Sequence, residues 1–236
     1  MSDRLLYIAE HFKGSFITPP EAIAAKRTQI KAYLFDWDGV FNNGYKDDNG
    51  SSSFSEVDSM GTNMLRYNHY LLTGENPFAA IVSGEHNKIA YKFAQREHFH
   101  AAYYKIADKS KALEHICNAQ NITPQEIAFV FDDVLDLAIA RLCGLRIMVA
   151  RQCNPLLLDY AQRNNMADYI TAANGGDHAV REAAELLTGL SGRFDDTIGG
   201  RIEFNDSYRN YLAARNAPNP LFYTSIDGTI TEKSPL

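Results

Sequence analysis

The sequence predicts one α/β domain of three layers, in which helices cover both faces of a parallel sheet. Three observations support this prediction. Short apolar runs alternate with longer segments of helical period. The short runs are hydrophobic at nearly every position, as expected of strands covered on both faces. The chain has 236 residues, 45% of them hydrophobic, which suits one domain with a full core.

Five apolar runs are expected to form the strands: residues 32–35, 78–82, 101–104, 127–130 and 146–149. Segments with helical period predict helices over residues 61–72, 87–97, 109–119, 134–143, 155–164 and 179–187. Pro20 can open a further short helix, because proline is favoured in a first helical turn. We divide the chain into an N-terminal helical lead-in (1–30), the α/β domain (31–190) and a C-terminal extension (191–236).

Two regions break the alternation. Residues 45–54 (YKDDNGSSSF) are polar and contain a D-N-G turn signal, which predicts a β-hairpin or flap beyond the first strand. Residues 191–236 are rich in Gly, Asn, Asp and Pro, so we expect little regular structure there. This extension is expected either to be loose or to pack on its own or a neighbouring subunit.

The composition limits the class of partner. The 23 Lys and Arg and 29 Asp and Glu give a formal charge of −6, so no general attraction to nucleic acid or an anionic membrane is expected. No apolar run approaches the roughly 20 residues needed to span a bilayer, and the first residues lack the pattern of a signal peptide. We therefore expect a cytoplasmic protein. The three cysteines have no C-x-x-C spacing, which argues against a zinc site.

Carboxylates follow two of the predicted strands. Asp36 and Asp38 come directly after the first strand, and Asp132, Asp133 and Asp136 follow the fourth. The carboxyl ends of parallel strands meet at one edge of the sheet, where α/β proteins bind their ligands. Carboxylates gathered there repel one another unless a cation lies between them, and Mg²⁺ prefers such oxygen ligands. The alternative is that Asp132 and Asp133 only cap the following helix.

A phosphate site is predicted at the same edge. Ser83 and Gly84 end the second strand and present a hydroxyl and an open backbone before a helix. Lys109 begins the helix after the third strand, where a cation is unfavourable for the helix dipole and a bound phosphate would explain it. Lys111 is an alternative that spacing alone does not exclude.

The order of these motifs resembles the haloacid dehalogenase (HAD) superfamily of phosphatases. The motifs are D-x-D-G-V at 36–40, S-G at 83–84, the helix-starting Lys109, and D-D-x-x-D at 132–136. Within the superfamily, the chain resembles the capless 3-deoxy-D-manno-octulosonate 8-phosphate (KDO 8-phosphate) phosphatases. Three stretches carry this resemblance: DGVFNNG with the polar segment after it, F-x-x-x-D-x-x-G at 54–61, and NGGDHAVREAAELL at 174–187. It implies a Rossmann-like HAD fold with a flap and without a cap domain.

The resemblance also implies roles for individual residues. Asp36 would be the nucleophile that accepts the phosphoryl group, and Asp38 the general acid and base. Ser83 and Lys109 would hold the phosphoryl oxygens. Asp36, the carbonyl of Asp38 and Asp132 would bind Mg²⁺. The supporting residues would be Gly84, Asp133 and Asp136.

The chain departs from the family at positions near the expected pocket. Glu85 stands where the family usually has Arg, and where the family usually has G-G-R-G this chain has Gly175, Gly176, Asp177 and His178. With His86, these residues are candidates for substrate contact. Since Arg is the usual partner of a carboxylate, these departures favour a neutral or amine-bearing sugar phosphate over a sugar-acid phosphate.

The expected function is therefore a Mg²⁺-dependent phosphatase of a small phosphorylated metabolite, a sugar or sugar-acid phosphate, acting through an aspartyl-phosphate. Two alternatives stay open: a phosphatase of nucleotides or other small phosphates, and a non-catalytic tetramerising or regulatory module. Glu85, Phe131 and Asp177, which depart from the family pattern, motivate the second. The resemblance further implies a homotetramer whose flap lies in an interface that closes the active site. Neither nucleic acid nor a membrane is an expected partner.

Overall fold

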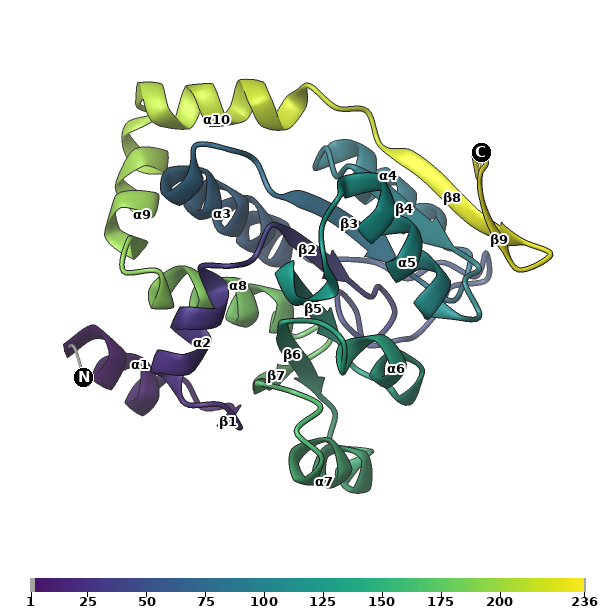
Figure 1. Cartoon of the computed structure of the whole chain (residues 1–236), viewed down its shortest axis with the longest axis horizontal. Coiled ribbons are helices and arrows are strands. Elements are labelled where there is room, and N and C mark those ends of the chain that lie inside the picture. The colour runs from purple at the N-terminus through teal and green to yellow at the C-terminus, as the bar shows by residue number, and fades with distance from the viewer. Residues whose placement is uncertain (1–2, 236) are drawn as a thin grey trace.

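The structure is a computed structural model and describes residues 3–235. One nine-stranded sheet forms the centre, in the order β1-β7-β6-β5-β2-β3-β4-β8-β9 (Figure 1). Neighbouring strands are parallel except at the two edges, where β1 and β9 run antiparallel. The strands are β1 (Ser15–Phe16), β2 (Ala32–Phe35), β3 (Phe78–Val82), β4 (Ala101–Tyr104), β5 (Ile127–Phe131), β6 (Leu145–Ala150), β7 (Tyr169–Asn174), β8 (Leu221–Ile226) and β9 (Thr229–Glu232).

Helices cover both faces of the sheet. They are α1 (Asp3–His11), α2 (Pro20–Arg27), α3 (Glu56–Thr73), α4 (Lys88–Arg96), α5 (Lys109–Gln120), α6 (Leu137–Ala140), α7 (Pro155–Arg163), α8 (Ala179–Leu190), α9 (Phe194–Glu203) and α10 (Asp206–Asn216). Along β2, Tyr33 and Phe35 pack with α1, α2, α3, α4 and α8 on one face. Ala32 and Leu34 pack with α5, α6 and α7 on the other. This alternation produces the predicted three layers.

The five predicted strands and most predicted helices are confirmed, with small shifts at their ends. The predicted helix over 134–143 is interrupted: a short 3₁₀ turn (Val134–Asp136) precedes α6. Asp133 causes the tight turn, since its carboxylate accepts a hydrogen bond from the backbone N–H of Val134. Residues 3–235 contain no separate cap domain, and none of their helices has the length and apolar character needed to cross a bilayer.

Residues 45–54, the flap loop, form a loop without strands instead of the expected hairpin. A turn closes the loop, with the N–H of Asp47 donating to the carbonyl of Ser51 at 2.7 Å. The Asp47 carboxylate also accepts from the N–H groups of Asn49 and Ser51. These backbone donors are therefore engaged by a side chain and do not pair across a ladder.

The prediction of an irregular C-terminal extension is wrong, because α9, α10, β8 and β9 occupy most of it. Tyr208 and Tyr211 of α10 are buried against Tyr67 of α3. β8 adds to the edge of the sheet parallel to β4, and β8 and β9 form a hairpin around a D-G turn. That D-G dipeptide lies between β-branched residues and was a readable hairpin signal.

Candidate active site

The residues predicted to carry chemistry gather at the carboxyl ends of β2 and β5. The N–H of Asp36 continues the strand ladder by donating to the carbonyl of Val130 at 2.9 Å, so the carboxylate leaves the sheet at a fixed point. Asp132 follows β5, which is paired in parallel with β2. Both carboxylates are buried, with residue exposures of 8% for Asp36 and 1% for Asp132.

Lys109 joins this group from the start of α5. Its Nζ lies 2.8 Å from Asp36 Oδ1 and 2.5 Å from Asp136 Oδ1. Burial opposes the charge of Lys109, but the two carboxylates outweigh it and raise the pKa of the ammonium above its ordinary value. Lys111, which the sequence left as an alternative, is exposed on the same helix. The structure therefore brings Lys109, and not Lys111, to the carboxylates.

Asp36, Asp132 and Asp136 form a buried cluster in which one carboxylate oxygen from each residue lies within 4.8 Å of the others. Burial, and then the nearby charge of Asp36, raises the pKa of Asp132 to about 8 and that of Asp136 to about 6. The Oδ1 atom of Asp132 is buried and has no hydrogen-bond partner. Three carboxylates, one of which has a buried oxygen without a hydrogen-bond partner, fit a divalent cation.

Asp38 lies beside the cluster and is held by the flap loop. Its Oδ2 is 2.7 Å from Lys46 Nζ, and its Oδ1 accepts a hydrogen bond from the Ser52 hydroxyl. Asn87 donates in turn to Ser52 Oγ at 2.6 Å. Trp37, between the two aspartates, points into the core as its position in an extended segment predicts, and is fully buried.

The clustered carboxylates, Asp38 and Lys109 line a pocket of about 230 Å³. Ser83 is a buried residue of the lining, and the N–H of Glu85 donates to the Ser83 hydroxyl at 3.2 Å. Glu85 and Asp133 are exposed at its rim. The other lining residues are Asp36, Asp38, Gly44, Gly84, Lys109, Asp132, Leu135, Asp136 and Arg151.

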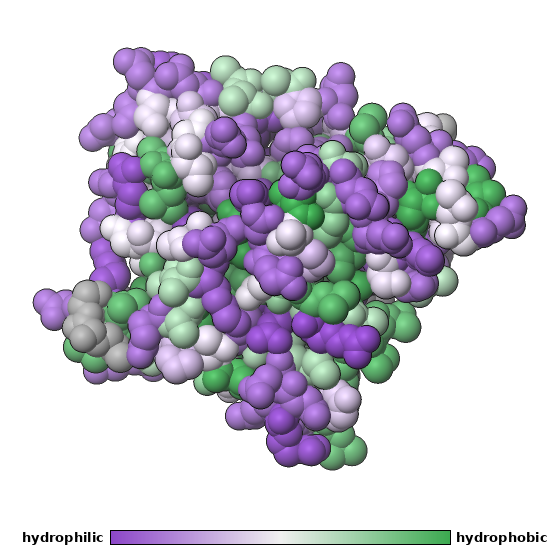
Figure 2. Space-filling view, viewed as in Figure 1, coloured by the Kyte–Doolittle hydropathy of each residue, from purple (hydrophilic) through white to green (hydrophobic). Residues whose placement is uncertain are grey.

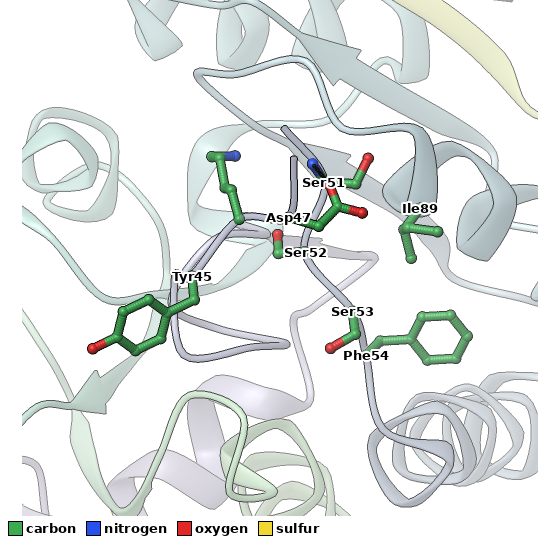
Figure 3. A pocket seen from close by; sticks show the side chains of 8 residues that line it. Tyr45, Asp47, Ser51, Ser52, Ser53, Phe54 and Ile89 are labelled. Carbon is green, nitrogen blue, oxygen red and sulfur yellow. Dashed lines mark hydrogen bonds between the residues drawn. The ribbon is translucent and has the colours of Figure 1, made fainter. Parts of the chain in front are cut away.

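A larger hollow of about 490 Å³ opens along the flap loop and is drawn in Figure 3. Tyr45 and Phe54 stand at opposite sides of this view, with Ile89 of α4 close to Phe54. The hollow shares Lys46 and Ser52 with the contacts of Asp38. The flap loop therefore links the two cavities.

Two predicted substrate candidates, Asp177 and His178, do not line the pocket of the carboxylates. Both are exposed, and His178 Nδ1 lies 3.1 Å from Ser55 Oγ. Their motif has a packing role: a Cβ added to Gly175 would lie 1.9 Å from the carbonyl oxygen of Gly39. Gly39 itself has a φ of +89°, which favours glycine in the turn after Asp38.

His86, the third candidate, is also outside that lining. Its ring packs edge-on against Tyr91 and Tyr104, with centroids 5.2 and 6.0 Å away.

Sequence reasoning missed Arg151, whose Nη2 lies 2.6 Å from Asp132 Oδ2. Its place directly after β6, at the same sheet edge, was the available signal. Lys46 was missed because it lies in an irregular loop.

Comparisons with known proteins agree with this geometry. No protein-family model matches the chain. The chain is 29% identical to 3-deoxy-D-manno-octulosonate 8-phosphate phosphatase KdsC of Escherichia coli K12 over 184 residues, 76% of this chain and 90% of that protein. The protein of the same name from Yersinia pestis is 25% identical over 181 residues, 75% of this chain and 89% of that one.

Solved structures show the same likeness. A HAD superfamily (subfamily III A) hydrolase from Legionella pneumophila aligns with a TM-score of 0.64 and 25% identity, covering 77% of this chain and 94% of that one. 3-Deoxy-D-manno-octulosonate 8-phosphate phosphatase from Moraxella catarrhalis, solved with magnesium, phosphate and KDO, aligns with a TM-score of 0.63 and 26% identity. That match covers 76% of this chain and 97% of the other. In sequence and in fold, these comparisons support a phosphatase of the HAD superfamily that resembles the 3-deoxy-D-manno-octulosonate 8-phosphate phosphatases.

Proposed function

We propose that the chain is a Mg²⁺-dependent phosphomonoesterase that acts on a small sugar phosphate through an aspartyl-phosphate. One observation carries this proposal: Lys109 lies between Asp36 and Asp136 in a buried group of carboxylates that line a pocket with Ser83. A carboxylate can attack an anionic phosphate only where cations offset the repulsion. Lys109 supplies one, and the carboxylate cluster has the donors for a second.

Asp36 acts as the nucleophile in this proposal. Its carboxylate oxygen bonds to phosphorus as the bond to the leaving oxygen breaks, and Asp38 gives that oxygen a proton. Asp38 then takes a proton from a water molecule, which attacks phosphorus and releases inorganic phosphate and free Asp36. Lys109 and Ser83 hold the phosphoryl oxygens.

The metal would be held by Asp36, Asp132 and the carbonyl of Asp38, with Asp136 and Asp133 as supporting residues. When bound, Mg²⁺ supplies positive charge next to the transferring group. Asp136 fixes Lys109 through the 2.5 Å contact. Arg151 neutralises part of the charge of Asp132 through its contact with Asp132 Oδ2.

The test is release of inorganic phosphate from a panel of sugar, sugar-acid and nucleotide monophosphates, with and without Mg²⁺. Metal-dependent turnover that Asp36→Asn abolishes would support the proposal. Turnover that survives this substitution would contradict it. Absence of turnover on every compound, together with no Mg²⁺ binding by calorimetry, would favour the non-catalytic module.

Glu85 points to the class of leaving group. The pocket is lined by six acidic and two basic side chains, and Glu85 is exposed at its rim, two residues after Ser83. A carboxylate on the leaving sugar would be repelled there, whereas an amine would be attracted. We therefore infer a neutral or amine-bearing sugar phosphate as substrate, although the relatives are named for a sugar-acid phosphate. Asp177 lies outside the pocket lining and does not contribute to this argument.

Three related compounds test this inference: glucosamine 6-phosphate, glucose 6-phosphate and 6-phosphogluconate carry a cationic, a neutral and an anionic sugar, the last in open-chain form. We expect kcat/KM to fall in that order, by about tenfold across the series if one exposed charge acts. Glu85→Gln should reduce this spread, and Glu85→Arg should reverse it. KDO 8-phosphate as the best substrate of the wild type would contradict the inference.

A further inference from the structure

A second polar pocket lies at the amino-terminal end of the sheet, opposite the active site. It has a volume of about 230 Å³ and lies where the last turns of α2, α3 and α8 meet. Ile30, two residues before β2, forms part of its lining, whereas the active site follows the other end of β2. α2 and α8 lie side by side in Figure 1.

Arg27 is the main feature of this pocket. It is 4% exposed, and its guanidinium donates a hydrogen bond to Asn68 Oδ1, while its buried Nε has no partner. Within residues 3–235, no carboxylate lies within ion-pair distance of Arg27. By contrast, the buried cations Arg66 and Lys109 each lie against a carboxylate. A buried charge without a counter-ion is costly, and the C-terminal end of α2 offsets only part of that cost.

His69 adds a second unused polar group to the same wall. It is 5% exposed, and its ring nitrogens make no hydrogen bond to the residues that the structure describes. Burial, and then the charge of Arg27, lowers the pKa of His69 to about 4. The imidazole is therefore neutral at physiological pH and offers one N–H donor. The positive charge of the pocket is that of Arg27.

The remaining lining explains what kind of anion fits. It contains no Asp or Glu, and its other members are apolar side chains and hydroxyl groups, with Ile30, Leu72 and Leu190 among the apolar ones. The hydroxyls of Thr28 and Thr73 already donate to backbone carbonyls. One guanidinium and one imidazole N–H suit a monoanion, and the apolar wall suits a hydrocarbon body.

We propose that this pocket binds a small organic carboxylate, with its carboxylate on Arg27 and its apolar body against Ile30, Leu72 and Leu190. The site is separate from the active site. α3 runs between the two, since its first residue Glu56 follows the flap loop and its last residue Thr73 lines the pocket. The proposal does not rest on the phosphatase function, because its test measures binding.

Sodium benzoate is the probe, benzamide its uncharged analogue of nearly the same shape, and inorganic phosphate the control for the active site. Binding to the full chain is measured by calorimetry and by NMR of ¹⁵N-labelled histidine. We expect saturable binding of benzoate with a shift of the His69 resonances. Benzamide should bind at least about tenfold more weakly, since it lacks the charge. Inorganic phosphate should leave His69 unchanged.

Arg27→Met keeps the length of the side chain and removes its charge, so benzoate affinity should fall at least about tenfold. Lys31→Met is the matched control: it removes an exposed positive charge near β2 and should leave the affinity unchanged. If Arg27→Met does not fold, the comparison of benzoate with benzamide on the wild type decides. Absence of a His69 shift, or an equal response to benzamide, would overturn the proposal.

Discussion

Lys109 is the residue on which the charge balance of the active site depends. It is 5% exposed and contacts two of the three clustered carboxylates, whereas Lys111 is exposed to solvent. Removing a buried cation leaves its partners as uncompensated buried charges, which is much costlier than losing an exposed charge. The two lysines therefore form a matched pair for mutagenesis.

Lys109→Met should lower kcat/KM by about 10²–10³-fold, as the loss of a group that stabilises transition-state charge typically does. Lys111→Met should change it by less than about twofold, as expected for an exposed residue. Phosphate-release kinetics, with circular dichroism to establish folding, measure both. Equal losses in the two variants would show that Lys109 has no special role.

At the scale of elements, Asp58 joins α3 to α8. It is fully buried, and its Oδ1 accepts a hydrogen bond from the backbone N–H of Arg181 at 2.8 Å, in the first turn of α8. Its Oδ2 has no partner. Burial is the main cause that raises the pKa of Asp58 to about 6. The F-x-x-x-D-x-x-G motif thus contains a carboxylate that holds two helices together.

This pKa makes stability depend on pH. Between about pH 4 and pH 6 the unfolded chain loses the Asp58 proton while the folded chain keeps it, so the free energy of unfolding falls as pH rises. The contribution is at most about 3 kcal/mol. Asp58→Asn has no such titration. In urea unfolding, the free energy of unfolding of the variant should therefore rise relative to that of the wild type as pH increases over this window. A difference that does not change with pH would contradict this assignment.

The C-terminal helices are an integral part of the domain. Tyr211 of α10 is fully buried, and its hydroxyl donates to Asn63 Oδ1 at 2.7 Å. Tyr211→Ala should lower the free energy of unfolding by about 3–5 kcal/mol, because it leaves a large cavity. Tyr211→Phe should cost about 1 kcal/mol, since it removes only the hydrogen bond. Urea unfolding measures both, and losses below about 0.5 kcal/mol in both variants would mean that α10 is only loosely attached.

At the scale of the whole molecule, the flap loop presents an exposed aromatic side chain that a partner can bury. Tyr45 is 81% exposed, and the adjoining hollow of about 490 Å³ is open. Figure 2 shows apolar residues scattered among polar ones on the face that it presents. The resemblance to capless phosphatases predicts that subunits meet at the flap loop.

We therefore expect a homotetramer, with a mass by light scattering of four times the 26.4 kDa chain. Tyr45→Ser should shift the assembly toward smaller species, because it removes an exposed aromatic anchor. Lys92 is an exposed residue on α4, and Lys92→Ser serves as the control. This variant should leave the tetramer unchanged. A monomer at all concentrations would contradict the prediction.

Much of the fold followed from local patterns. The apolar runs at 32–35, 78–82 and 101–104 became β2, β3 and β4 with the predicted bounds, because strands covered on both faces are hydrophobic throughout. The packing of α10 was not predicted, because it depends on Tyr67 of α3, far away in the sequence. The D-G turn of the β8–β9 hairpin was a local signal, but the pairing of β8 with β4 was not readable from it. The flap loop forms no hairpin, because the Asp47 carboxylate accepts hydrogen bonds from backbone N–H groups that a ladder would need. Composition does not reveal this local competition.

The sequence by itself predicted which residues gather at the site: Asp36, Asp38, Ser83, Lys109 and Asp132 each follow a predicted strand, and a parallel α/β sheet brings the carboxyl ends of its strands to one edge. Only the tertiary structure decided which neighbours complete the site. Lys109, and not Lys111, contacts the carboxylates, and Arg151 pairs with Asp132. Asp177 and His178 lie outside the lining of the pocket. The tertiary structure also placed Arg27 beside His69. The reason is physical. Which residues follow a strand can be read from local sequence, whereas ion pairs and burial depend on side chains from distant segments that only packing brings together.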